Sequence, residues 1–224
     1  MDTSHNRSLR TGILVALLVA SILLWDSIAL YPVKVFVVLL HELAHGLAAV
    51  ATGGSIVRIE ISELIGGLAV TQGGWPLLVV SSGYIGSMIF GGLILLGAQR
   101  ARLVRPIAAG IGVLVLGVTL AYIRNGFGLV FGALAGAALV AAARWLPRLP
   151  LEVALQYLGA VSCLYALVDV KEDLLTTEHR LTDATILQTM TGVPALVWGI
   201  LFSLLALVVF VVIMRRAWRA ARGV

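Results

Sequence analysis

Charged side chains are scarce in this sequence. Asp, Glu, Lys and Arg together make up 12% of its 224 residues, whereas hydrophobic residues make up 60%. The mean hydropathy of +1.05 lies far above that of soluble globular domains. This composition excludes a water-soluble fold and indicates a membrane protein. The chain also has a single cysteine, Cys163, which excludes an intrachain disulfide.

Long polar segments are lacking too, so the chain has no room for a separate soluble domain. An apolar window of about 20 residues is enough to cross a bilayer. We therefore predict one membrane-embedded domain over residues 1–224, an all-α polytopic fold of the cell membrane with about seven transmembrane helices. Residues 1–11 form an N-terminal tail and residues 215–224 a basic C-terminal tail. The seven windows are Gly12–Tyr31, Val33–Thr52, Pro76–Ala98, Val104–Ile123, Gly126–Trp145, Leu151–Leu174 and Val193–Met214.

The basic residues outnumber the acidic ones, 16 against 11, which raises the question of nucleic acid. Most of the arginines, however, stand in short groups at the ends of the apolar windows, as in the segments 100–105, 144–148 and 215–222. Such groups are typical of the loops beside transmembrane helices. We expect membrane lipids as partners and no nucleic acid.

A polar interruption at residues 53–75 follows the second window. Val57, Ile59 and Ile61 alternate with polar residues, and Gly66 and Gly67 offer a turn, which predicts a short β-hairpin. The outer strand of such a hairpin carries unpaired backbone groups that can hold an extended peptide. An ordinary connecting loop is the alternative.

Small residues recur at four-residue spacing in the third window, at Gly83, Ser87 and Gly91. On a helix this spacing creates a flat face, where another helix backbone can approach closely. We expect this face to shape a site without taking part in its chemistry.

The stretch "VVLLHELAHGLAAV", residues 37–50, places ionisable side chains inside an apolar helix. His41 and His45 are four residues apart, so both imidazoles project from one helix face and can reach one metal ion. In this arrangement the histidines bind Zn²⁺, a third protein group completes the set, and a water takes the fourth position. Glu42 is then the general base of a metal-activated hydrolysis. Because ionisable groups within a membrane are costly, we predict that these three residues are functional.

The third ligand has to be a carboxylate that reaches the depth of His45. Four aspartates remain once depth is considered: Asp26, Asp169, Asp173 and Asp183. If the second and sixth windows run in the same direction, His45 lies about 10 Å from the end of its helix and Asp169 about 7 Å from the end of its own. These matching depths favour Asp169.

The other candidates stay open. Asp173 is one turn further out on the same face, as an alternative ligand or an outer partner of the ligand. Asp183 precedes the last window and would require the chain to fold back into the membrane. Asp26 comes from a window of opposite direction and lies deeper. His179 and Cys163 are weaker alternatives.

These motifs together resemble the site-2 protease family of intramembrane zinc metalloproteases, and more closely its compact B-like branch. The resemblance runs from about Pro32 to Met214 and is carried by "HELAHGLAAVATGG", the hairpin, "SSGYIGSMIFGG" and the late acidic segment "LVDVKEDLL". It implies histidine ligands at His41 and His45, the base at Glu42, and an aspartate ligand from a later helix. The better-known members carry that aspartate in an Asp-Gly pair, which this sequence lacks.

The resulting functional hypothesis is an intramembrane zinc endopeptidase that cleaves transmembrane protein substrates, with the hairpin receiving the unwound substrate. The alternative is a non-proteolytic metal-binding scaffold or a metal carrier. Asn125, between the fourth and fifth windows, is either a loop-capping residue or a hydrogen-bond donor to the developing oxyanion.

Overall fold

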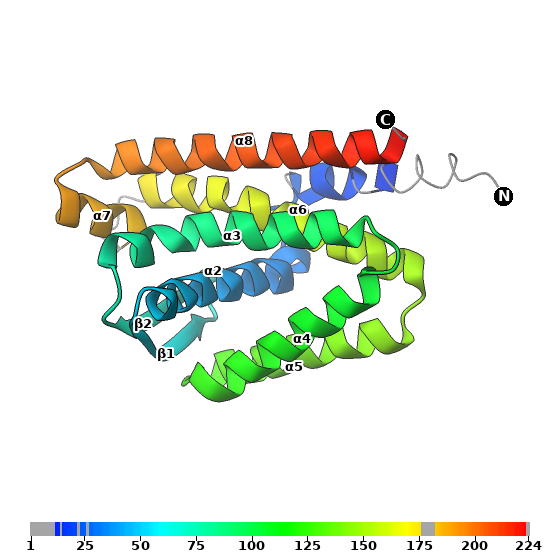
Figure 1. Ribbon diagram of the computed structural model, residues 1–224, viewed down its shortest axis with the longest axis horizontal. Helices are drawn as coiled ribbons and strands as arrows, with labels where there is room; N and C mark the ends of the chain where they lie inside the picture. Colours follow the sequence, from blue (N-terminus) through cyan, green and yellow to red (C-terminus); the bar gives the residue numbers. More distant parts are fainter. Residues whose placement is uncertain (1–11, 14, 22, 26, 176–181, 223–224) are drawn as a thin grey trace.

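The computed structural model describes residues 12–222 except residues 14, 22, 26 and 176–181, and the side chains of 166–175, 214 and 217–222 are outside that description. The molecule is a bundle of helices with a small β-hairpin at one end, beside α2 (Figure 1). The elements in chain order are η1 (Ile28–Leu30), α2 (Tyr31–Ala51), β1 (Ser55–Ser62), β2 (Gly66–Gln72), α3 (Pro76–Ala98), α4 (Val104–Tyr122), α5 (Gly126–Trp145), α6 (Arg148–Leu175), α7 (Asp183–Thr191) and α8 (Ala195–Arg222).

The described helices follow most of the predicted windows. Prolines stand in the first turn of α2 and of α3, where the missing N–H has no helical partner to lose. Within the described residues, five segments are long and apolar enough to cross a membrane: Ile28–Ala51, Pro76–Ala98, Val104–Tyr122, Gly126–Trp145 and Ala195–Ile213. The chain is therefore an integral membrane protein, but the predicted count of seven spans is not confirmed. The window Gly12–Tyr31 includes residues outside the described ones, and α6 is a helix that is not among the five.

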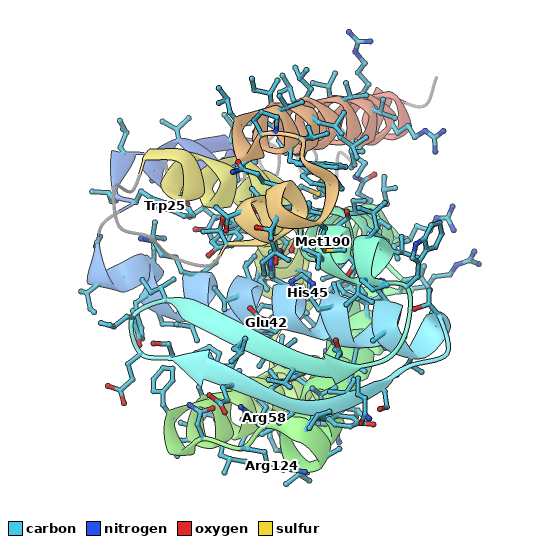
Figure 2. The ribbon with its side chains drawn as sticks, turned by 90° about the vertical axis from the view of Figure 1, so that its left-hand side faces the viewer. Trp25, Glu42, His45, Arg58, Arg124 and Met190 are labelled. Atoms are coloured by element: carbon cyan, nitrogen blue, oxygen red, sulfur yellow. The ribbon has the colours of Figure 1, made fainter. Side chains whose placement is uncertain are left out.

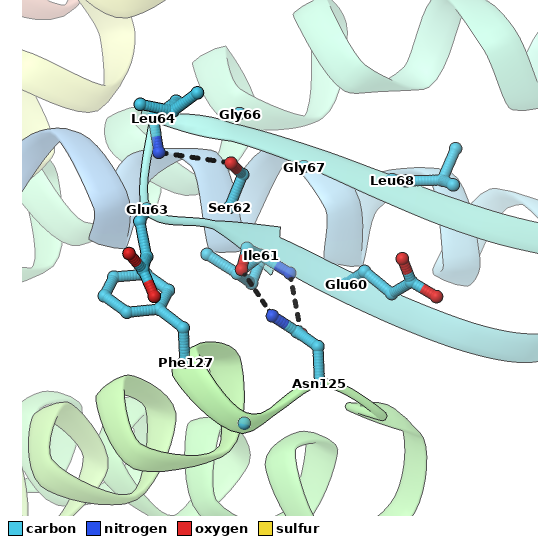
Figure 3. Close-up of a pocket in the computed structure, with 11 residues that line it drawn as sticks. Glu60, Ile61, Ser62, Glu63, Leu64, Gly66, Gly67, Leu68, Asn125 and Phe127 are labelled. Atoms are coloured by element: carbon cyan, nitrogen blue, oxygen red, sulfur yellow. Dashed lines mark hydrogen bonds between the residues drawn. The ribbon is translucent and has the colours of Figure 1, made fainter.

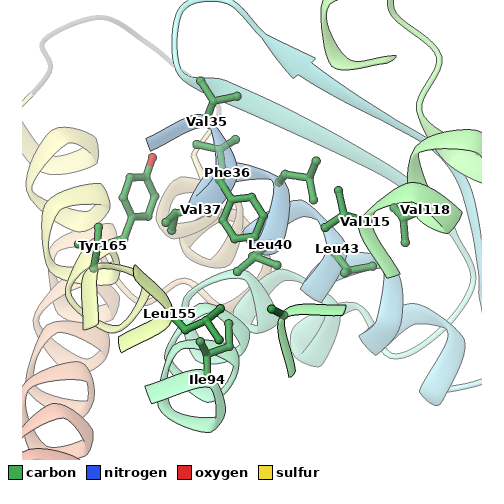
Figure 4. Close-up of a cluster of buried hydrophobic side chains, with 14 of the residues drawn as sticks. Val35, Phe36, Val37, Leu40, Leu43, Ile94, Val115, Val118, Leu155 and Tyr165 are labelled. Carbon is green, nitrogen blue, oxygen red and sulfur yellow. The ribbon is translucent and has the colours of Figure 1, made fainter. Parts of the chain in front are cut away.

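Helix α2 lies at the centre of the molecule. Every residue from Lys34 to Gly46 is buried, so this helix meets protein on all sides over more than three turns. Figure 4 shows its apolar side chains in contact with α3, α4 and α6 through residues such as Ile94, Val115 and Leu155. A helix placed in this way is shielded from lipid and can carry polar side chains.

Small residues bring α3 against its neighbours, as the spacing in the third window predicts. A Cβ atom on Gly91 would lie 2.5 Å from the carbonyl oxygen of Gly159 on α6, and a Cβ on Gly86 would overlap Ala44 on α2. The backbones of α3, α2 and α6 therefore approach one another closely.

Helices α4 and α5 form a pair at the edge of the bundle (Figure 1). At one end, Arg105 Nη1 of α4 donates to the carbonyl oxygen of Ala143 near the end of α5, at 2.7 Å. At the other end, Arg124 N donates to the carbonyl oxygen of Ile59 in the hairpin, at 3.1 Å. These contacts connect the pair to the hairpin.

The hairpin predicted at residues 53–75 is present, and the alternative of an irregular loop is wrong. Strands β1 and β2 are antiparallel, with Ile59 opposite Ala69 and Ile61 opposite Gly67. The turn comes earlier than predicted, before Gly66, so Gly66 and Gly67 belong to β2 instead. A bulge between Ile56 and Arg58 also breaks the predicted alternation, which leaves Val57 47% exposed while Ile59 and Ile61 are fully buried.

Candidate metal centre

Helix α2 presents the three residues of the predicted motif to one buried place. His41, Glu42 and His45 are each less than 9% exposed and lie in the second half of the helix, beside the hairpin. Figure 2 looks onto this end of the molecule, where Glu42 and His45 lie behind the strands. The imidazole centroids of the two histidines are 4.9 Å apart, as their one-turn spacing predicts.

Neighbouring groups orient both imidazoles. His45 Nδ1 lies 2.7 Å from the carbonyl oxygen of Val79, an acceptor, so Nδ1 carries a proton, and Nε2 is the nitrogen that lies toward Asp183 and becomes a ligand atom when it is unprotonated. The ring of His41 packs edge-on against Tyr84 of α3, with centroids 5.7 Å apart. Both rings are thus held before any metal arrives.

Among the described side chains, the carboxylate that meets these histidines is Asp183. Its Oδ2 atom lies 3.1 Å from His41 Nε2 and 3.1 Å from His45 Nε2. The three residues offer donor atoms that all lie within 4.8 Å of one another. Asp183 is the first residue of α7, and its side chain is 15% exposed.

The donor set fits a zinc ion. Two atoms that each bind zinc at about 2.1 Å are at most about 4.2 Å apart; the two distances from Asp183 to the histidines, 3.1 Å each, lie below this limit, and all three donors lie within 4.8 Å of one another. Two imidazole nitrogens and one carboxylate oxygen are also ordinary zinc ligands. Gly83 of α3 keeps the space beside them free, because a Cβ there would overlap His41 Nε2 and lie 2.5 Å from His45 Nε2.

The charge of Asp183 suits this role. Burial raises the pKa of its carboxyl group, but the neighbouring His45 and hydrogen bonds with both imidazoles outweigh burial and hold that pKa well below its usual range. The group is therefore an ionised carboxylate at the first turn of α7, where the helix dipole favours negative charge.

Strand β2 covers Glu42. Gly67 lies against its side chain, since a Cβ on Gly67 would be 2.5 Å from Glu42 Oε1. The backbone N–H of Ala69, two residues along the strand, points toward the same edge of β2 and lies near the Glu42 carboxylate. One edge of the hairpin thus faces the candidate base.

The two edges of the hairpin differ. The outer edge of β1 is closed by the loop between α4 and α5: Arg124 N donates to Ile59 O, and the Asn125 amide makes two hydrogen bonds with the backbone of Ile61, at 2.7 and 3.1 Å. Asn125 stands at the N-cap position of α5, but its side chain makes no capping hydrogen bond there, so the predicted capping role is not confirmed and the oxyanion role stays a prediction. The backbone N–H and C=O groups of Ile59 and Ile61 point away from β2. Those of their partners Ala69 and Gly67 therefore point toward the opposite edge of the hairpin, next to Glu42.

A cavity of about 660 Å³ opens between the tip of the hairpin and the α4–α5 loop (Figure 3). It is lined by Glu60 and Glu63 among others, and Asn125 forms its floor on the α5 side. This cavity lies beside the closed edge of β1, apart from the histidines.

The remaining ligand candidates are distributed as follows. Asp169, the predicted third ligand, and Asp173 belong to α6, but their side chains lie outside the described ones, so the structure does not test them. Asp26 and His179 also lie outside the described residues. Cys163 is buried in α6 and its thiol donates to the carbonyl oxygen of Met88, at 3.5 Å.

The role of Asp183 has a local signal in the sequence. Thr182 caps α7 by accepting from the backbone N–H of Thr185, and Gly192 ends the helix in the left-handed conformation. Ala184 and Leu187, three residues apart, are the buried positions of α7. A capped short helix with one apolar face is a segment that folds back onto the bundle, which places its first residue inside.

Comparisons with known proteins bear on the whole chain. The family model described as Peptidase M50B-like matches residues 14–213, which is most of the sequence and includes all three residues of the candidate centre. The match confirms the resemblance to the site-2 proteases drawn from the motifs. Neither the curated proteins nor the solved structures gave a match.

Proposed function

The chain belongs to the Peptidase M50B-like family, and we propose that this membrane peptidase is a zinc-dependent endopeptidase that cleaves transmembrane segments of other proteins. The observation that carries the proposal is the convergence of His41, His45 and Asp183 beside Glu42 in a buried site. We place the enzyme in the cell membrane.

Asp183 takes the place of Asp169 in the proposed ligand set. It is the aspartate that lies within hydrogen-bond distance of both imidazoles, and its carboxylate is ionised and partly shielded from water. A zinc ion held by His41, His45 and Asp183 supplies Lewis acidity, which lowers the pKa of water to about 7 and polarises a peptide carbonyl. Asp169 and Asp173 remain the candidates against which this assignment has to be tested.

Glu42 is the proposed general base. It follows His41 directly in α2, so its carboxylate lies beside the ligand nitrogens without being one of the three donors. It would take a proton from the attacking water and deliver it to the leaving amine. Its burial excludes bulk water, which strengthens these electrostatic effects.

The edge of β2 that faces Glu42 is the proposed place of the substrate backbone. A transmembrane substrate has to unwind before its peptide bond can be attacked, and pairing with a strand edge replaces the hydrogen bonds that it loses. The N–H of Ala69 lies on this edge, so a substrate carbonyl that accepts from it would be placed beside Glu42.

The test compares wild type with Glu42→Gln after reconstitution with a transmembrane peptide. We expect zinc at one equivalent in both proteins by elemental analysis, and a loss of cleavage of about 10²–10⁴-fold in the variant, the usual contribution of a general base. Equal cleavage by both proteins would exclude the proposed mechanism. Zinc binding without cleavage in wild type would favour a non-proteolytic scaffold or carrier instead.

The ligand assignment is tested separately by metal affinity. We expect Asp183→Asn to lower zinc affinity by more than about 100-fold. This is a larger loss than removal of a residue that only orients a ligand would cause. Asp169→Asn and Asp173→Asn serve as matched controls and should retain zinc. If Asp169→Asn loses zinc and Asp183→Asn keeps it, Asp169 is the ligand and the assignment to Asp183 is wrong.

A further inference from the structure

Asp183 is the first residue of the short helix α7. Helix α7 has nine residues, which is about 13 Å of helix and below the length at which an isolated helix is stable. A tilt of about 1° would move its first residue by about 0.2 Å, the tolerance of a metal–ligand distance. Whatever holds α7 in place therefore controls the ligand geometry at Asp183.

The far end of α7 is attached to α8. Trp198 Nε1 donates to Thr191 Oγ1 at 3.2 Å, where Thr191 is the last residue of α7. The backbone N–H of Ala195 donates to Gln188 Oε1 at 2.7 Å. Figure 1 shows α7 beside the beginning of α8, at the end of the molecule that also holds the hairpin.

A stack of aromatic rings continues from this attachment to the histidines. Trp198 stacks on Phe202, with centroids 5.8 Å apart, and Phe202 stacks on Tyr84 at 4.9 Å. Tyr84 in turn meets the edge of the His41 ring at 5.7 Å. Leu187 of α7 is fully buried in the same cluster. The rings thus contact both elements that bring ligands, α2 and α7.

We infer that Tyr84, Phe202 and Trp198 are positioning residues that set the place of Asp183 relative to His41. The inference rests on the proposed function, because it requires that these residues bind a metal. Residues that orient a ligand change metal affinity by about 10–100-fold when they are removed. Tyr84 meets the ring of His41 and Trp198 bonds Thr191 of α7, so the effect of the stack passes through the two elements that carry the ligands.

The experiment measures zinc affinity by competition with a chelator, on the full-length protein in detergent. We expect Trp198→Ala to lower the affinity about 10–100-fold, and Trp198→Phe, which keeps the stacked ring, to recover most of it. Leu204→Ala is the matched control, since Leu204 lies on the same helix with 57% of its surface exposed. It should bind zinc as wild type does.

A double-mutant cycle separates positioning from a general loss of stability. If Trp198 acts through Asp183, Trp198→Ala should cause no further loss of affinity in an Asp183→Asn background. With Co²⁺ in place of zinc, Trp198→Ala should also shift the visible spectrum, which reports ligand geometry. Phe202→Ala is the second variant for the same measurements, and thermal unfolding checks that each protein is folded.

The outcomes are distinct. The inference is overturned if Trp198→Ala and Phe202→Ala bind zinc with wild-type affinity. It is also overturned if Trp198→Ala lowers the affinity equally in the wild-type and Asp183→Asn backgrounds. Both results leave the proposed function intact. A wild-type protein that binds no zinc would overturn both. Loss of affinity that disappears in the Asp183→Asn background supports the inference.

Discussion

Helices α2 and α8 are opposites within one bundle. The segment that contains α2 is the least apolar of the five candidate spans and is 78% buried, whereas the one in α8 is the most apolar and is only 22% buried. Most of the surface of α8 is exposed and would contact lipid, so its sequence is almost uniformly apolar. The central helix is surrounded by protein, and it is there that the histidines and Glu42 are found. In this protein hydropathy therefore marks exposure to lipid, and the weakest apolar signal marks the centre.

The largest effect, on zinc affinity, is expected at Gly83, where α3 lies against the histidines of the central helix α2. Gly83→Ala places a methyl group over the Nε2 atoms of His41 and His45, in the space that we assign to the metal. We expect zinc affinity to fall by more than about 100-fold, beyond the effect of residues around a ligand. Chelator competition measures the change.

The matched control is Gly110→Ala on the peripheral helix α4, where a Cβ meets nothing within 4 Å. This variant should bind zinc like wild type. Zinc binding by Gly83→Ala at wild-type affinity would show that the metal position inferred from the three donors is wrong.

A smaller loss is expected where the hairpin meets the same helix. Gly67→Ala would drive the Glu42 side chain away, since the new Cβ lies 2.5 Å from Oε1. Zinc should remain, because Glu42 is not one of the three donors. The cleavage rate should fall by about 100-fold, which is the lower end of the loss expected for Glu42→Gln. The paired measurement of zinc content and cleavage rate checks this, and a parallel loss of both would argue against a separate role for Glu42.

The sequence predicts most of the fold because lipid imposes a strong pattern. The bounds of α3 and α5 agree with the predicted windows to the residue, and the hairpin follows from the alternation around Ile59 and Ile61. The motif in α2 predicts two candidate ligands and a candidate base, and His41 and His45 lie on one face of the helix as its periodicity requires. Local rules are sufficient for features that depend on neighbours in sequence.

Asp183 could not be found from such rules alone. Its position depends on α7, a short helix that folds back after the long helix α6, and estimates of depth from helix ends favour Asp169. The Thr182 cap and the apolar positions Ala184 and Leu187 predict the helix, but which helices receive it is a matter of tertiary packing. An aspartate 142 positions from His41 is brought into contact with it by that packing.

A moderate effect on stability is expected at the closed edge of β1. Asn125→Ala removes both hydrogen bonds to the Ile61 backbone and leaves its N–H and C=O without their side-chain partner. Loss of a buried partner costs about 1–3 kcal/mol. Thermal unfolding in detergent should show the decrease with zinc affinity unchanged, because the edge of β2 and not that of β1 faces Glu42. A change in zinc affinity would mean that the two edges are coupled.

The smallest effect, and the opposite sign, is expected on the lipid-facing side of α4. A Cβ on Gly117 meets nothing within 4 Å, whereas a Cβ on Gly112, five residues earlier, would lie 2.8 Å from the carbonyl oxygen of Gly136 on α5. Alanine is favoured over glycine within a helix by up to about 1 kcal/mol, so Gly117→Ala should raise the unfolding temperature slightly. Gly112→Ala has to separate α4 from α5 and should lower it, as overpacking does by about 1–3 kcal/mol. The two variants change the same helix by the same atom group, so a difference in sign between them can come only from what each face contacts. If Gly117→Ala is as destabilising as Gly112→Ala, the outer face of α4 has a protein partner and does not face lipid.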